Sequence, residues 1–111
     1  MAVSEPPRFP PDVARALQEP AGRVSFRYTR PERADWPPRH NTPLMETPYE
    51  RVLASIVLDT KLNLRFVRTG SREEGARVVR TGVAGLVDVK HWHIELVWDA
   101  DHMQVRVGSA P

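Results

Sequence analysis

The sequence predicts a small, β-rich α+β protein, with an antiparallel sheet of sandwich-like or barrel-like type and one or two short helices. Apolar residues recur at every second position through much of the chain, which is the period of a half-buried strand. Five of the six glycines lie at or after Gly70, while ten of the eleven prolines lie at or before Pro48. At 111 residues the chain has the length of a single domain, spanning 1–111.

The first predicted elements are one short helix and one strand. Residues 11–19 predict the helix, because a proline suits the first helical turn and another proline follows its end. Residues 23–30 predict the strand, because polar side chains alternate strictly with Val24, Phe26 and Tyr28. We therefore expect that apolar face of the strand to be buried.

Residues 31–48 form a polar, proline-rich segment, for which we predict an irregular arm, lid or loop. Within it, Trp36 is followed directly by Pro37 and Pro38, and a large aromatic side chain on such an arm suits docking onto a partner. Together with Tyr49, these residues are the predicted partner-binding site. The alternative is that Trp36 folds back over the protein's own core, because an exposed tryptophan is costly in water.

Residues 48–58 carry two competing patterns. The sequence Thr-Pro-Tyr-Glu at 47–50 has the form of a capping box with proline at the first helical position, which predicts a helix over 48–58. Against this, nearly all even-numbered residues from Val52 to Phe66 are apolar, which is the pattern of a long strand. We favour the helix, followed by a strand over 61–69.

The rest of the chain predicts β-structure throughout. We expect a turn over 70–75, a strand over 76–81 and a turn region over 82–85. The clearest strand is 91–98, where two tryptophans, an isoleucine and a leucine share one face. An alternating segment over 102–107 follows a turn-forming Asp-Ala-Asp sequence, so these two segments predict a hairpin.

The register of this hairpin follows from matching the apolar faces, since a slip of one residue would set apolar against polar side chains. This matching requires a loop of two or four residues. Glu95 then forms a cross-strand ion pair with Arg106. The matched pairs are Trp98 with Met103, Leu96 with Val105, and Glu95 with Arg106.

The apolar phase changes from odd-numbered to even-numbered residues near Lys90, which predicts a β-bulge or a sharp bend there. With that shift, His91 and His93 point to the more solvated face of the strand. Two imidazoles on one face are a geometry that a metal ion can use, although exposed histidines on a strand need no ligand. We expect no cofactor, with a metal ion at His91 and His93 as the alternative.

The spacing Gly85-(five residues)-His91-Trp-His93 resembles the opening of the first motif of the cupin family. The resemblance covers about nine residues and implies a small β-barrel that holds a metal ion. The family's glutamate is missing, because valine and tryptophan stand at its expected positions, and the second cupin motif is not recognisable. No ligands are therefore carried over. Residues 88–108 also resemble the strand pair of laminin-G-type sandwiches, which supports a β-sheet.

Charge is unevenly distributed along the chain. Residues 61–81 hold six basic against two acidic residues, a local charge of +4, and residues 82–111 hold two basic against four acidic, a local charge of −2. The nucleic-acid alternative is a sheet face whose basic side chains contact the phosphates of the nucleic-acid backbone. Its four residues are Arg65, Arg68, Arg77 and Arg80. We favour association with a protein partner or another copy, which the same dipolar distribution suits.

Several function classes find no support in the sequence. It contains no cysteine, no phosphate-binding glycine loop and no nucleophile elbow, and it has no apolar window long enough to span a membrane. We therefore predict a non-catalytic, cytoplasmic interaction or assembly module that binds a protein partner or itself, as a homo-oligomer or as a subunit of a complex. The alternatives are a cupin-like metal enzyme that uses His91 and His93, and a nucleic-acid-binding protein.

Overall fold

A computed structural model describes residues 7–32, 36–37, 39–48, 53–69 and 75–111. The described residues form one α-helix, one 3-10 turn and seven strands. In chain order these are α1 (Pro11–Ala16), β1 (Gly22–Thr29), β2 (Thr42–Glu46), β3 (Ala54–Leu58), β4 (Asn63–Thr69), β5 (Ala76–Gly82), η1 (Ala84–Leu86), β6 (His91–Trp98) and β7 (Met103–Ser109). Within the described chain, no helix is long and apolar enough to cross a membrane.

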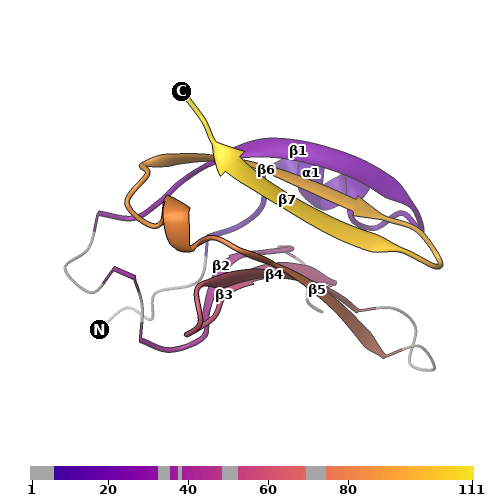
Figure 1. Cartoon of the computed structure of the whole chain (residues 1–111). Helices are drawn as coiled ribbons and strands as arrows, with labels where there is room; N and C mark the ends of the chain where they lie inside the picture. Colours follow the sequence, from indigo (N-terminus) through magenta and orange to yellow (C-terminus); the bar gives the residue numbers. More distant parts are fainter. Residues whose placement is uncertain (1–6, 33–35, 38, 49–52, 70–74) are drawn as a thin grey trace, which may run out of the picture.

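The strands form two antiparallel sheets, with the strand orders β1-β6-β7 and β2-β3-β4-β5. Figure 1 shows the two sheets as two layers, with β5 of one layer near β7 of the other. None of the described strands pairs with both sheets, so the sheets are not closed into a barrel. The predicted β-rich class is confirmed, and its barrel alternative is wrong.

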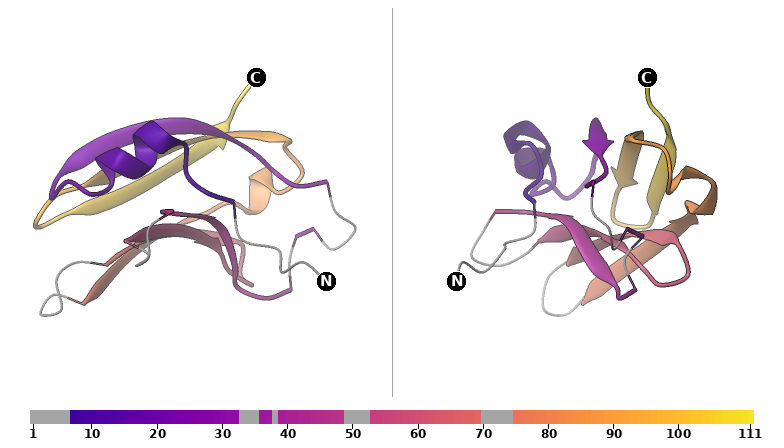
Figure 2. Two further views of the ribbon diagram at one scale, coloured as in Figure 1. Left: turned by 180° about the vertical axis from the view of Figure 1, so that it is seen from behind. Right: turned by 90° about the vertical axis from the view of Figure 1, so that its left-hand side faces the viewer.

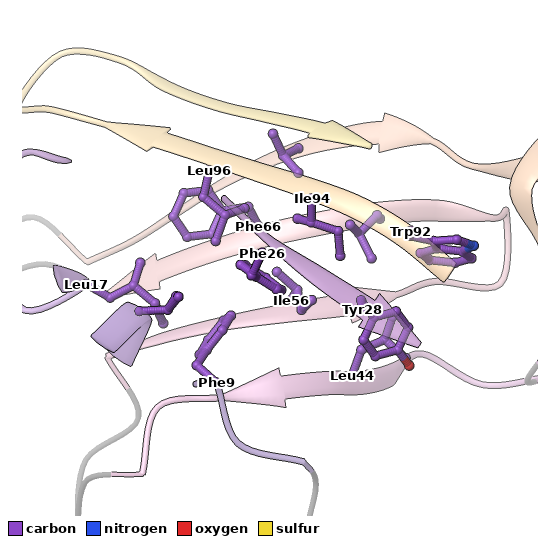
Figure 3. Packing of buried hydrophobic residues seen from close by; sticks show 14 of the residues in the cluster. Phe9, Leu17, Phe26, Tyr28, Leu44, Ile56, Phe66, Trp92, Ile94 and Leu96 are labelled. Atoms are coloured by element: carbon purple, nitrogen blue, oxygen red, sulfur yellow. The ribbon is translucent and has the colours of Figure 1, made fainter. Parts of the chain in front are cut away.

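The hydrophobic core lies between the two layers (Figure 3). Its largest fully buried side chains are Trp92, Trp98 and Phe66, and the rings of Phe66 and Trp98 meet edge to face at 6.3 Å. Phe26 and Tyr28 are also buried, as the alternation in the first strand predicts. One sheet face in each layer is therefore apolar, and the other is left to solvent.

The N-terminal segment and α1 cover one side of this core. The helix lies alongside β1 (Figure 2) and buries Val13 and Ala14. Just before it, the Phe9 N–H donates to the Glu46 carbonyl at 3.2 Å, and the Glu46 N–H donates to the Pro7 carbonyl at 3.0 Å. These two hydrogen bonds form a single parallel bridge between the N-terminal segment and the outer edge of β2, at Glu46.

The β6–β7 hairpin has the predicted register in all three pairs, Trp98 with Met103, Leu96 with Val105, and Glu95 with Arg106. Its four-residue turn is held by Asp99, whose Oδ1 accepts the N–H groups of Asp101 and His102 at 2.7 Å each. These hydrogen bonds lower the pKa of Asp99. The Glu95 carboxylate, however, is bound by Arg23 of β1 at 2.8 Å, on the other side of β6 from Arg106.

The helix predicted over 48–58 is wrong where the structure describes it, because Ala54–Leu58 is strand β3. Residues 49–52 lie outside the described residues. The hydroxyl of Thr47, the expected helix cap, instead accepts the N–H groups of Leu53 and Ala54 at 2.9 and 3.3 Å. Thr47 therefore leads into a strand, and the period-two pattern outweighs the capping signal because pairing with β2 and β4 buries β3.

The prediction of an irregular segment over 31–48 is also wrong in part, because Thr42–Glu46 forms strand β2. Pro43 lies within it, and this position is tolerated because β2 is at the edge of its sheet. The change of the apolar positions from odd-numbered to even-numbered residues near Lys90 comes from a bend, the second of the two predicted causes. The chain bends at Lys90, and Val87 belongs to a turn before β6 begins. His91 and His93 consequently point away from the core, as expected.

Candidate binding pocket and basic face

Trp36 folds back onto the core, which is the second of the two predicted alternatives. Its Nε1–H donates to the Val87 carbonyl at 2.6 Å, and its ring centroid lies 6.0 Å from that of Trp92. The Nε1–H of Trp92 is directed to the same turn, at 2.8 Å from the Leu86 carbonyl and 3.0 Å from the Val89 carbonyl. Two indole groups thus fix the turn that precedes β6, and Trp36 remains partly exposed.

The exposed side of Trp36 forms one wall of a pocket of about 260 Å³. We call this the Trp36 pocket. Its lining combines two aromatic rings, three prolines, two other apolar side chains and two threonines. The lining residues are Pro7, Tyr28, Thr29, Pro31, Trp36, Thr42, Pro43, Leu44 and Met45.

The pocket opens where the ends of β1 and β2 meet the N-terminal segment. The register of β2 against β3 shifts between Pro43 and Met45, so Leu44 is an extra residue in the strand. Such a bulge re-aims side chains that would otherwise alternate between the two faces, and Leu44 and Met45 both line the pocket. Figure 3 places Tyr28 at the end of the core where Leu44 and Trp92 lie, and the Tyr28 and Trp92 rings are 5.5 Å apart.

Of the other predicted partner-binding residues, Pro37 is exposed next to Trp36. Pro38 and Tyr49 lie outside the described residues. The sequence therefore predicts one wall of the pocket, Trp36. It does not predict the walls that β1 and β2 contribute. Their contribution depends on the pairing of distant segments, and no local pattern signals it.

His91 and His93 lie on the outer face of the three-stranded sheet. His91 is opposite Thr29, whose Oγ1 is 3.0 Å from the His91 Nδ1, and His93 is opposite Arg27. Partial burial lowers the pKa of His91, and the positive charges of Arg27 and Lys90 lower it further. The charge around His91 is therefore positive.

Metal binding at the two histidines finds no third ligand in the described part of the chain, where no group of three or more histidines, cysteines, aspartates or glutamates is placed to hold an ion. The neighbouring side chain across the sheet from His93 is an arginine, which repels a cation. This arrangement suits an anion better than a metal ion.

Arg27, His91, His93 and Arg106 form a surface that we call the basic face. Arg106 lies on β7 opposite Glu95, and all four side chains point to the outer side of the sheet. The glutamate between them is neutralised by Arg23, and this contact lowers the pKa of Glu95. Sequence reasoning identified the two histidines and the pairing of Glu95 with Arg106. It did not place Arg27 beside His93, because the register of β1 against β6 joins segments far apart in the chain.

The four arginines of the nucleic-acid alternative are not brought to one surface. Arg65 is paired with Arg80 and Arg68 with Arg77, but the two pairs lie on opposite faces of the β4–β5 ladder. Arg68 and Arg77 face the layer interior, where Arg68 donates to the Glu19 carbonyl at 2.6 Å and Arg77 to the Asp99 carbonyl at 2.9 Å. These two arginines thus bind main-chain groups of the protein itself.

Arg65 is held by a buried carboxylate. Its Nε–H donates to the Asp59 Oδ2 at 2.9 Å, and only 2% of the Asp59 side chain is exposed. The Asp59 Oδ1 accepts the N–H groups of Asn63 and Lys61, both at 2.9 Å. The Asn63 N–H is the main cause of a lowered pKa of Asp59, the Lys61 N–H and Arg65 add to it, and burial opposes it.

No protein-family model matches the chain, no curated protein matches it, and no solved structure matches it. The function is therefore inferred from the chemistry of its own residues.

Proposed function

We propose that this protein is a non-catalytic interaction module whose Trp36 pocket receives an apolar side chain of a protein partner. The observation that carries the proposal is the composition of the pocket wall. The described lining residues include no carboxylate, imidazole, amine, guanidinium or thiol. Such a wall offers apolar contact and hydroxyl groups, and it lacks the paired acid and base that proton-transfer catalysis needs.

The size of the pocket supports a side chain as its occupant. Pockets that hold drug-sized ligands and cofactors have volumes of about 300–1,000 Å³, and the Trp36 pocket measures about 260 Å³. A wall of tryptophan, tyrosine and proline also resembles the aromatic-lined grooves that receive apolar or proline-containing peptide segments. Trp36 is suited to this role because its hydrogen bond to Val87 fixes the orientation of its ring before a partner binds.

The test is a titration of the 15N-labelled protein with N-acetyl-leucinamide and N-acetyl-prolinamide, followed by NMR. We expect weak, saturable shifts at the Trp36 indole and at the Thr29, Thr42 and Met45 amides. Thr42→Trp places a large side chain at the pocket and should abolish these shifts. Gln104→Trp adds the same side chain on an exposed position of β7 and should leave them unchanged.

A second blocking variant, Pro43→Trp, guards against misfolding of the first, because Pro43 also lines the pocket and is exposed. Absence of saturable shifts in the wild type, or equal shifts in the blocked variants, would overturn the proposal. Sedimentation over a range of concentrations separates a partner from a second copy. Self-association that the blocking variants abolish would assign the pocket to another copy of this chain.

A further inference from the structure

We propose that the partner of the Trp36 pocket is an acidic segment, which places an apolar side chain in the pocket and carboxylates on the basic face. This inference rests on the proposed function and specifies the chemistry of the partner. It is carried by the junction between the pocket and the basic face, by the Arg27 guanidinium, which makes no ion pair in the described chain, and by the spacing between the two.

The pocket and the basic face share Thr29. This residue lines the pocket, and its hydroxyl lies 3.0 Å from the Nδ1 of His91 on the basic face. A segment that leaves the pocket past Thr29 therefore passes directly onto His91. Arg27 is the next residue of β1 on the same face, opposite His93.

Arg27 makes no ion pair among the described residues, and the basic face holds one acid, Glu95. Glu95, the acid of this face, is engaged by both Nη2 and Nε of Arg23, at 2.8 and 3.2 Å. Glu32 lies 3.4 Å from Lys90. The charges of Arg106 and His93 also act on Glu95 and lower its pKa, which leaves Arg27 as the charged group of this face without an acid in the described chain. A carboxylate that complements Arg27 therefore has to come from another molecule.

The surface above His93 is open. Its partner on β7 is Gly108, and a Cβ atom built at Gly108 would meet no atom within 4 Å. A bound segment can therefore approach the imidazole and the Arg27 guanidinium from the solvent side. Guanidinium groups bind carboxylates through two parallel N–H donors, which gives an acidic side chain a defined position here.

The spacing fits an extended peptide. Thr29 and Arg27 are two residues apart on one strand, about 7 Å, and an extended peptide repeats its side chains on one face at the same interval. An apolar residue in the pocket therefore places the residue two positions along the peptide near Arg27. A second copy of this chain is less suited as the occupant, because the chain carries a net charge of +2.

The test compares acetyl-Leu-Gly-Glu-Glu-amide with acetyl-Leu-Gly-Gln-Gln-amide in NMR titrations of the labelled protein. We expect the glutamate peptide to bind about two- to fivefold more tightly at low salt, the range of an exposed ion pair. High salt should reduce this ratio. Arg27→Gln should bring it close to one, whereas Arg15→Gln should preserve it, because Arg15 is exposed on α1 and carries the same charge.

The outcomes separate this inference from the proposed function. Equal binding of both peptides, abolished by Thr42→Trp, would overturn the acidic partner and leave the pocket function standing. Failure of both peptides to bind would overturn both proposals. If the glutamate peptide still binds the Thr42→Trp variant, it binds the basic face without using the pocket, and the inference is overturned. Competition by a short oligothymidylate at Arg27 and His93, stronger than by the glutamate peptide, would assign the face to nucleic acid and also overturn it.

Discussion

Three arginines of the four-stranded sheet and two of the three-stranded sheet have opposite environments. In the four-stranded sheet, Arg65 binds the buried Asp59, and Arg68 and Arg77 donate to main-chain carbonyls. In the three-stranded sheet, Arg27 and Arg106 point to solvent without an ion pair in the described chain. The same residue type thus binds groups of the protein itself at Arg65, Arg68 and Arg77 and leaves a guanidinium exposed to solvent at Arg27 and Arg106. The register of each strand, more than composition, decides between these two uses.

The sharpest test of this contrast is removal of the carboxylate that holds Arg65. Asp59→Ala leaves two N–H groups and one guanidinium without their acceptor, so we expect a loss of about 2–4 kcal/mol in the free energy of unfolding. Urea denaturation measures this loss. A change below about 1 kcal/mol would contradict a structural role for the Asp59–Arg65 pair.

Acid should weaken the same contact. Hydrogen bonds from Asn63 and Lys61 and the charge of Arg65 lower the pKa of Asp59 in the folded protein, so its contribution is complete above the unfolded pKa of about 4. The contribution is lost as the pH falls through the folded pKa. Unfolding free energies measured below about pH 4 should therefore fall more steeply in the wild type than in Asp59→Ala. Parallel curves for the two proteins would contradict this assignment.

A smaller loss is expected for Arg68→Ala. The variant removes a hydrogen bond to Glu19 and the contact of the guanidinium with the Trp98 ring, whose centroid is 5.9 Å away. We expect a loss of about 1–2 kcal/mol. Arg80→Ala is the control within the same sheet, because Arg80 is exposed, and it should change stability by less than about 0.5 kcal/mol. Equal losses of unfolding free energy in Arg68→Ala and Arg80→Ala would contradict a difference between bound and exposed arginines.

The smallest effect on stability belongs to the basic face. Arg27→Ala should leave the thermal unfolding midpoint of the protein nearly unchanged, since an exposed side chain without an ion pair contributes little. Thermal unfolding followed by circular dichroism measures this. A clear loss of stability would place Arg27 with the structural arginines and weaken its role toward a partner.

The parts of the fold that could be predicted are those whose information is local. The turn chemistry at Asp99 and the alternation on either side of it determine the β6–β7 register. The helix at 11–19 is marked by prolines, although α1 ends earlier, at Ala16. The failures at β2 and β3 have a shared cause: Pro43 and the capping pattern at Thr47 are local signals that pairing with neighbouring strands overrides.

The candidate site likewise combines residues that local sequence marks with residues that only the pairing of distant strands brings together. Trp36 and the two histidines stand out in the sequence because of their residue types and spacing. Tyr28, Thr29 and Arg27 join them only through the antiparallel pairing of β1 with β6, which spans more than half of the chain. Met45 joins through a bulge that no local pattern marks. The chemistry of single residues was accessible from sequence, and their assembly into a surface was not.

The two ends of the described chain lie beside the same surface. Pro7 lines the Trp36 pocket, and the N–H of Ala110, next to the last residue, donates to the His91 carbonyl at 2.8 Å. Any segment joined at either end is therefore tethered near the site, where its effective concentration can reach millimolar values. A tag with apolar or acidic residues at either of these ends would therefore compete with a weak ligand for the proposed site. Labels belong on the Asp99–His102 turn, at the opposite end of β6.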